Sequence, residues 1–200
     1  MNTRTGSGPR LSARERLLAA AGELFYENGF NTVGIDRVIE HAGVAKASLY
    51  DCFGSKDELI RSYLEERNQA RKARINERLA RYTQPADRIL SIFDLLGELA
   101  AQPGYRGCAF VRASADASSS DKIKSVCNES RAFILDTFTD LCRAAGVTDP
   151  EQLAKQLVLL YDGASISAHL DGNRNAVATA RALAAQMLVL HNPTLKILNV

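Results

Sequence analysis

Four side chains suited to contact with DNA are grouped at the start of a short predicted helix, residues 45–53. Lys46 can reach a phosphate or a guanine edge, and the Ser48 hydroxyl can bond a phosphate or a base. Ala47 is small enough to approach a thymine methyl group, and Tyr50 offers a hydroxyl and a flat ring to the DNA backbone. The alternative interpretation is that these side chains are ordinary solvated surface groups.

The residues before this helix complete a corner of two helices. Residues 35–41 form a short amphipathic helix, and Gly43 permits a tight turn into the next one. Two short helices packed at a steep angle can seat the second helix in the major groove. Many helical proteins contain such a corner, so this pattern alone indicates DNA binding only weakly.

The wider segment TVGIDRVIEHAGVAKASLYDCFGSKDELI, residues 32–60, resembles the N-terminal domain of the TetR family of one-component transcriptional regulators. Residues 20–30 resemble helix 1 of that domain. The resemblance implies that Lys56 clamps a phosphate at a helix N-terminus, where backbone amides and a cation converge on an anion. It makes Arg37 a further candidate for contact with the DNA backbone. The alternative for both residues is a solvated charge.

Three features near this segment leave its details open. Cys52 stands where the family often has a histidine or a similar polar residue, and a thiol is a poor hydrogen-bond donor. Asp51 puts an acid close to the expected DNA backbone. Arg4 and Arg10, in an N-terminal arm predicted to be flexible, are candidates for the minor groove. The alternative is an arm without a role.

Helix signals dominate the whole chain of 200 residues, and no segment shows sustained β alternation. Ser12 and Glu15 have the spacing of a capping box, and Asp149 precedes a proline suited to a first helical position. The ambiguous segment is 105–120. We predict an all-α chain with about nine helices, over roughly 13–28, 35–41, 45–53, 56–82, 86–101, 121–145, 150–170 and 174–191, with a short ambiguous piece before 121.

Composition narrows the class of protein. The chain has 46% hydrophobic residues, no run long enough for a transmembrane helix and no apolar secretory leader, which predicts a cytoplasmic protein without a membrane partner. Its 4 Cys form no Cys-x-x-Cys pair, and Cys108, Cys127, Cys142 and His169 lack metal-site spacing. The main enzyme signatures are absent, so we predict no enzyme, cofactor or metal. Residues 1–83 hold 14 basic and 11 acidic residues, a weak hint of DNA.

The family resemblance also implies a domain organisation. We expect a flexible arm (1–10), a three-helix helix-turn-helix domain (11–62) and a helical domain for effector binding and dimerisation (63–200). A homodimer would read a pseudo-palindromic operator in double-stranded DNA, typically as a repressor. The two last helices are rich in small and aliphatic residues suited to a four-helix interface, or to the chain's own core: Leu153, Leu157, Leu160, Ala164, Ala168, Ala180, Leu183, Ala184, Met187, Leu188 and Leu190.

An inducer site is expected among the central helices. Tyr161, Ser165 and His169 are spaced i, i+4, i+8, so they share one face of an otherwise apolar helix. A pocket with few polar groups suits a small, largely hydrophobic ligand. The candidate lining residues, for each of which core packing is the alternative, are Phe93, Leu96, Cys108, Phe110, Phe133, Tyr161, Ser165 and His169.

Two alternative functions stay open. The segment 106–110, Arg-Gly-Cys-Ala-Phe, resembles a Gly-Cys sequence in a subset of the family, some of whose members sense oxidants or electrophiles through the cysteine. Cys108 is therefore either a thiol sensor or a small buried hydrophobe. The second alternative is a helical interaction module that has lost DNA binding. The presence of Lys46, Tyr50 and Lys56 favours a DNA-binding regulator over that alternative.

Overall fold

The computed structural model describes residues 11–116, 120–172 and 175–195, and within those ranges it contains nine helices and no strand. The predicted all-α fold is thus confirmed. Arg4 and Arg10 lie outside the described residues. The helices are α1 (Ala13–Asn28), α2 (Ile35–Ala42), α3 (Lys46–Phe53), α4 (Lys56–Leu79), α5 (Pro85–Ala100), α6 (Ala109–Asp116), α7 (Asp121–Ala144), α8 (Pro150–Leu170) and α9 (Asn175–His191).

The predicted caps set the helix ends. The Ser12 hydroxyl accepts a hydrogen bond from the Glu15 amide (3.2 Å), while the Glu15 carboxylate accepts one from the Ser12 amide (2.7 Å). These two bonds satisfy amide groups that have no partner within α1. The Ser12 amide and the Ser12 hydroxyl, which both donate to the Glu15 carboxylate, lower the pKa of Glu15. Asp149 caps α8 in a similar way by accepting from the Gln152 amide (3.2 Å), and Pro150 occupies the first helical position.

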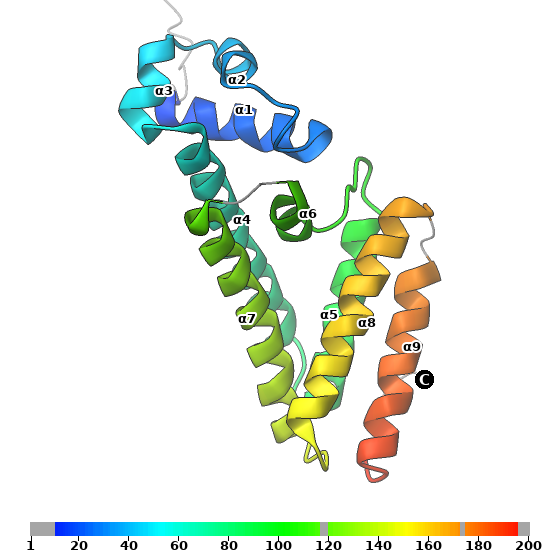
Figure 1. The fold of residues 1–200 in the computed structure, drawn as a ribbon. Coiled ribbons are helices and arrows are strands. Elements are labelled where there is room, and N and C mark those ends of the chain that lie inside the picture. The colour runs from blue at the N-terminus through cyan, green and yellow to red at the C-terminus, as the bar shows by residue number, and fades with distance from the viewer. Residues whose placement is uncertain (1–10, 117–119, 173–174, 196–200) are drawn as a thin grey trace, which may run out of the picture.

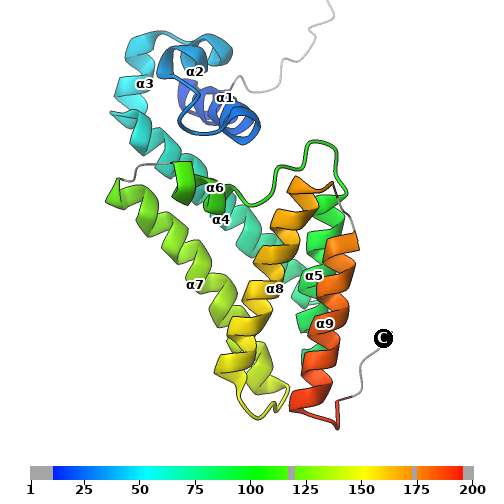
Figure 2. The ribbon, with the colours of Figure 1, turned by 45° about the vertical axis from the view of Figure 1, so that its right-hand side comes forward.

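The molecule has two parts, which we call the head (α1–α3) and the body (α4–α9). Figure 1 shows the head at one end, with α4 running from it along the length of the body. Helix α7 lies beside α4, and α5, α8 and α9 form a second group that packs against both (Figures 1 and 2). The short helix α6 lies between the head and these long helices.

Two hydrophobic clusters hold these parts together. One lies within the body and is centred on the rings of Phe93, Phe138 and Tyr161, whose centroids are 5.9–6.4 Å apart. The other combines the buried faces of α1–α3 and the first half of α4 with Phe110 of α6 and Ile123 of α7. The core of the head is therefore completed by three helices of the body, α4, α6 and α7.

Helix α6 is the main element that the sequence left ambiguous. Residues 113–120 read as a loop or a frayed helix, but the structure continues the helix to residue 116 because Phe110 and Ala113 are buried against α7. The end of α4 also differs slightly from the prediction. This helix ends at Leu79, whereas the sequence predicted an end near residue 82. Among the described helices, none is both long enough and apolar enough to cross a bilayer.

Candidate DNA-binding face and interior cavity

The turn between α2 and α3 is fixed by backbone geometry and by α1. Gly43 has φ +61°, in the left-handed region that side chains disfavour, and its amide donates to the Glu40 carbonyl (3.1 Å). The Arg16 guanidinium donates to the Gly43 carbonyl (3.0 Å) and the Ala42 carbonyl (3.4 Å). Helix α1 thereby holds the corner that orients α3.

Helix α3 has one buried face and one exposed face. Leu49 and Phe53 are buried in the core of the head. Lys46, Ala47 and Tyr50 are exposed, and Ser48 is partly buried, so the structure presents the predicted DNA-contacting residues along one edge of the head. Tyr50 keeps 46% of its surface in solvent, a large exposure for an aromatic residue.

The two residues that departed from the family pattern lie in different surroundings. Cys52 is half-buried and packs against the core of the head, which explains why a weakly polar side chain is accommodated there. Asp51 is exposed. The acid that pairs with a cation on the surface of the head is Asp36 of α2.

Lys46 is paired across the corner. Its Nζ donates to the Asp36 carboxylate at 2.8 Å, and this contact raises the pKa of Lys46. Both side chains are largely exposed, so the pair is weak and exchangeable. Arg37, the neighbouring residue on α2, is exposed as well.

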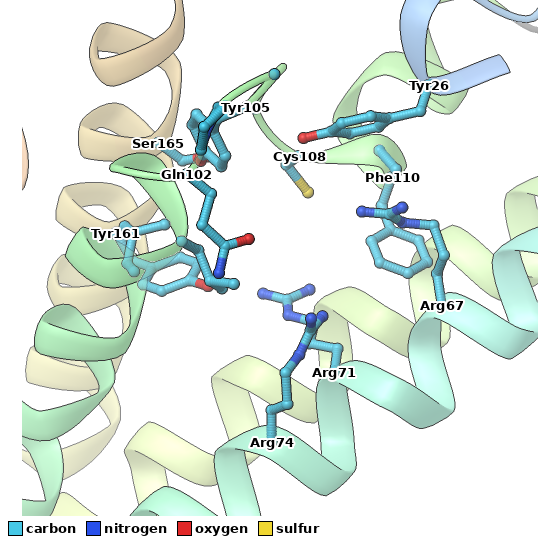
Figure 3. A pocket seen from close by; sticks show the side chains of 16 residues that line it. Tyr26, Arg67, Arg71, Arg74, Gln102, Tyr105, Cys108, Phe110, Tyr161 and Ser165 are labelled. Atoms are coloured by element: carbon cyan, nitrogen blue, oxygen red, sulfur yellow. The ribbon is translucent and has the colours of Figure 1, made fainter. Parts of the chain in front are cut away.

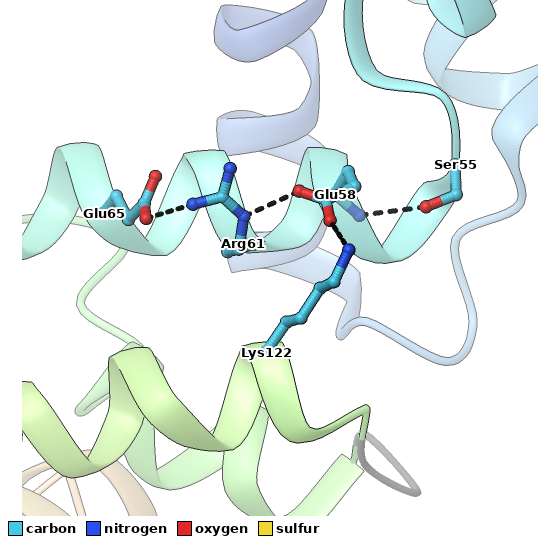
Figure 4. Close-up of polar contacts among 5 residues, drawn as sticks. All are labelled: Ser55, Glu58, Arg61, Glu65 and Lys122. Carbon is cyan, nitrogen blue, oxygen red and sulfur yellow. Dashed lines mark hydrogen bonds and ion pairs between the residues drawn. The ribbon is translucent and has the colours of Figure 1, made fainter.

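Lys56 is the first residue of α4. The Ser55 hydroxyl accepts from the Glu58 amide (3.2 Å), and partial burial lowers the pKa of Lys56. Figure 4 shows Glu58 also bound by Arg61 of the same helix and by Lys122 of α7, which together lower the pKa of Glu58. These contacts tie the start of α4 to α7.

Comparisons with known proteins agree with this geometry. Residues 17–63 match the family model described as bacterial regulatory proteins, tetR family. The crystal structure of a putative TetR transcriptional regulator from Streptomyces avermitilis MA-4680 is 30% identical, with a TM-score of 0.76 over 87% of this chain and 98% of that one. The chain belongs to the TetR family.

Two curated relatives of this TetR-family chain match over shorter segments. The HTH-type transcriptional activator FasR of Mycolicibacterium smegmatis is 41% identical over 64 residues, 32% of this chain and 29% of FasR. The HTH-type transcriptional repressor BdcR of Escherichia coli K12 is 38% identical over 64 residues, 32% of each chain. The match thus spans about a third of each relative. Family and relatives are transcription regulators, which confirms the prediction that the chain is not an enzyme.

A cavity of about 300 Å³ lies in the body, next to the head. Its walls come from the end of α1, from α4, α5, α6 and α8, and from the loop after α5 (Figure 3). Five of the eight residues predicted for the inducer site line it: Leu96, Cys108, Phe110, Tyr161 and Ser165.

The other three predicted residues lie elsewhere. Phe93 is fully buried in the body's core, with its ring 6.2 Å from that of Tyr161. Phe133 is half-buried, with the Lys72 ammonium 5.5 Å from its ring centre. His169 lies against Gly107, where an added Cβ would be 3.5 Å from the His169 Cβ. Each has the helical position of a lining residue but faces a neighbouring element instead.

Sequence reasoning missed several residues of the cavity wall. Arg67, Arg71 and Arg74 line it from α4, and Tyr105 lines it from the loop after α5. The spacing i, i+4, i+7 of the arginines was a usable signal for a shared helix face. Tyr105 exchanges a hydrogen bond with Ser165 (2.7 Å), and burial raises the pKa of Tyr105 to about 12.

Tyr26 connects this cavity to the head. It lies on the last turns of α1, lines the cavity, and accepts a hydrogen bond at its hydroxyl from the Arg106 amide (2.8 Å). Its carbonyl accepts one from the Arg112 guanidinium of α6 (2.6 Å). The Arg67 guanidinium stacks 4.7 Å from the Tyr26 ring centre. Tyr26 therefore links the cavity wall to α1 by direct contacts.

An apolar stripe is exposed on α8 and α9. Leu159 and Leu170 keep 67% and 74% of their surface in solvent, and Leu190 keeps 77%. Ile166 and Leu183 extend the stripe with 41% and 42%. Most of the small and aliphatic residues predicted for an interface instead fill the chain's own core: Leu153, Leu157, Ala164, Ala168, Ala180, Ala184 and Leu188. Leu160 and Met187 are partly buried against that core.

Proposed function

We propose that this protein is a homodimeric, ligand-responsive repressor that binds a pseudo-palindromic operator through α3. In this proposal residues 11–62 bind DNA, and residues 63–200 bind an effector and dimerise. The observation that carries it is the exposed edge of α3, with Lys46, Ala47 and Tyr50 facing out from a helix whose other face is buried. Such a helix can enter the major groove without disturbing the core that holds it.

Contacts to the DNA backbone would surround this edge. Lys56, the first residue of α4, would receive a phosphate together with the first amides of that helix. Ser48 on α3 and Arg37 on α2 would add contacts from either side of the corner. Lys46 would exchange Asp36 for a phosphate or a base. Because phosphate contacts release counterions, operator affinity should fall steeply with salt concentration.

The exposed stripe on α8 and α9 supports the homodimer. Leu159, Leu170 and Leu190 are large apolar side chains in water, and such a patch commonly marks an interface. Two helices from each copy would form a four-helix interface related by a two-fold axis, which matches the symmetry of a palindromic operator. Changing Leu170 to Glu should produce monomers in sedimentation experiments, whereas Val111→Glu, at an exposed apolar residue of α6, should not.

The cavity beside the head supports the effector site. An inducer that binds better to the conformation that does not fit the operator would release the protein from DNA. Tyr26 provides a direct route, because one side chain of α1 belongs to the cavity wall and is bonded to the loop after α5.

The experiment that tests this proposal is capture and sequencing of genomic DNA fragments bound by the purified protein. We expect one short inverted repeat, and we expect Tyr50→Ala to lose it while remaining folded. Tyr82→Ala is the matched control, because Tyr82 is an exposed tyrosine beyond the far end of α4 and should leave binding intact. Equal, sequence-blind binding by all three proteins would contradict the proposal.

Cys108 favours a second candidate function, release from DNA by electrophiles. Its sulfur points into the cavity in Figure 3, and the residue is only partly buried. Cys142 is buried, which raises the pKa of its thiol to about 12 and makes it inert. If Cys108 is the sensor, alkylation by N-ethylmaleimide should release the operator from the wild type but not from Cys108→Ser. Equal release of both proteins would exclude it.

A further inference from the structure

Three arginines of α4 share one face and one cavity. Arg67, Arg71 and Arg74 are spaced i, i+4, i+7, and all three line the cavity beside the head. Figure 3 shows the side chains of Arg71 and Arg74 rising from α4 toward Gln102 and Tyr161, with Arg67 below Tyr26. Three positive charges are therefore collected in one small space.

This space holds no compensating acid. The lining residues of the cavity, all within the described part of the chain, include neither Asp nor Glu. Arg78, the next arginine on the same face of α4, does have an acidic partner in Glu98. Asp162 shares a neighbouring cavity with Arg71, but Arg131 holds its carboxylate. The ion pairs of the described residues thus leave the three cavity arginines without a carboxylate partner.

Two of these arginines are held in place by other contacts. The Arg71 guanidinium lies 5.8 Å from the Phe110 ring centre and 5.6 Å from that of Tyr161, and it donates to the Ser130 hydroxyl (2.9 Å). Arg67 stacks on Tyr26 at 4.7 Å. Arg74 is exposed to solvent. Ring contacts position a guanidinium while leaving most of its N–H donors free for a planar acceptor.

The remaining wall is apolar or neutral. Phe110, Tyr161 and Leu96 offer ring and aliphatic surface, and the hydroxyls of Tyr105 and Ser165 are already bonded to each other. A bound molecule would meet the cations of α4 with the Phe110 and Tyr161 rings beside them. Guanidinium groups and carboxylates pair in a fixed two-bond geometry, which makes a carboxylate the matching head group.

We propose that the cavity binds a small organic anion, with its carboxylate held by Arg71 and Arg74 and its hydrocarbon part against Phe110 and Tyr161. This proposal rests on the cavity being the effector site of the proposed function. The anion relieves the repulsion among the three arginines. A neutral ligand of the same shape leaves that repulsion in place, and a cationic one increases it.

The test compares the effects of carboxylic acids and of the corresponding amides on thermal unfolding. The pairs, each with the same hydrocarbon part, are benzoate and benzamide, phenylacetate and phenylacetamide, and octanoate and octanamide. We expect at least one acid to raise the Tm of the wild type more than its amide does, at equal concentration and ionic strength. Sodium chloride and inorganic phosphate serve as controls for non-specific ion effects. If no acid exceeds its amide in any pair, the proposal is wrong.

Arginine variants locate the effect. Arg74→Gln should weaken binding of the best acid roughly tenfold, the usual loss for one charged hydrogen bond. Arg74 makes no contact that holds the fold, so this variant should remain folded, and Arg71→Gln provides a second measurement. Arg81→Gln is the matched control, because Arg81 is an exposed arginine paired with Glu77 away from the cavity. Equal weakening by Arg81→Gln, or none by either cavity variant, would place the anion elsewhere and overturn the proposal.

Failure of this proposal differs visibly from failure of the proposed function. If amides bind as well as acids and still release the operator, the effector site stands and its anionic character is wrong. If acids bind through Arg74 but the protein has no specific operator, the cavity chemistry stands and the repressor function is wrong.

Discussion

The head and the body place their positive charges in opposite surroundings. Lys46 on the head lies in water and is paired with Asp36, a contact that a phosphate can replace at little expense. Arg71 and Arg74 in the body face a cavity whose wall has no acid. Surface cations with exchangeable partners suit a large polyanion, whereas cations that line a cavity without an acidic partner suit a small anion. The same charge type is thus prepared for two ligands of different size.

The body also differs from the head because it buries the Cys142 thiol and the Tyr105 phenol. We expect the largest effect here, a loss of folding stability at alkaline pH. Burial raises the pKa of Cys142 from 9.0 to about 12. The folded state therefore holds this proton more tightly, so its stability is intact below pH 9 and is lost as pH rises toward 12, by at most about 1.4 kcal/mol per pH unit. Tyr105 adds to this loss above its unfolded value of 10.0.

Urea unfolding at several pH values measures the alkaline loss. Cys142→Ala should reduce the slope of unfolding free energy against pH above pH 9, after allowance for its lower stability at pH 7. An unchanged slope in this variant would show that the thiol does not titrate as its burial implies.

Removing Lys56 from the head should give the next largest effect. Lys56→Ala should weaken operator binding roughly tenfold and reduce its salt dependence by about one phosphate contact. Fluorescence anisotropy over a series of salt concentrations measures both quantities. Lys155→Ala, at an exposed lysine near the start of α8, at the end of the body away from the head, should leave both unchanged. Matching losses in the two variants would mean that only net charge matters.

Removing the partner of Lys46 should have a smaller effect of opposite sign. Asp36→Asn frees Lys46 and removes a negative charge close to the expected DNA backbone, so operator affinity should rise about threefold, a size typical of a surface charge pair. Glu40→Gln removes another exposed acid of α2 without freeing Lys46. If both variants gain equally in the same anisotropy assay, the Asp36 contact has no specific role.

The smallest predicted effect concerns the stability of the ligand-free body. Arg74→Gln removes repulsion from Arg71, one turn away on α4, and breaks no ion pair, so the free energy of unfolding should rise by a few tenths of a kcal/mol. Added salt should shrink this gain because it screens the repulsion. A stability loss in this variant, measured by chemical denaturation, would show that Arg74 already has a stabilising partner.

Local signals in the sequence predicted most of the fold. Ser12 with Glu15 and Asp149 with Pro150 determined where α1 and α8 begin, because a cap depends on residues within one turn. The exposed edge of α3 followed in the same way from the positions of Leu49 and Phe53. Helix α6 was ambiguous because its burial depends on α7, which local propensity does not report.

The cavity was only partly predictable for a similar reason. Arg67, Arg71 and Arg74 share a helix face by spacing alone, but they appeared as part of a charged, solvated stretch. This face becomes a cavity wall because Tyr105 and Tyr161 form other parts of the same wall. These two residues lie thirty to ninety positions later in the chain, so local sequence does not reveal the contact. Phe93 and His169 show the converse, since helical spacing placed them near the cavity and packing turned them to other neighbours.

The shared core of head and body has a consequence for folding cooperativity. Phe110 and Ile123, from α6 and α7, fill the same cluster as Leu49 and Phe53 of α3. A fragment ending at residue 62 loses the side chains of α6 and α7 and also Tyr63, whose ring contacts Phe25 and Phe30. It therefore leaves apolar surface open on α1 and should be only marginally stable alone. Because α3 shares this cluster with α6, native-state hydrogen exchange should show the two helices opening together.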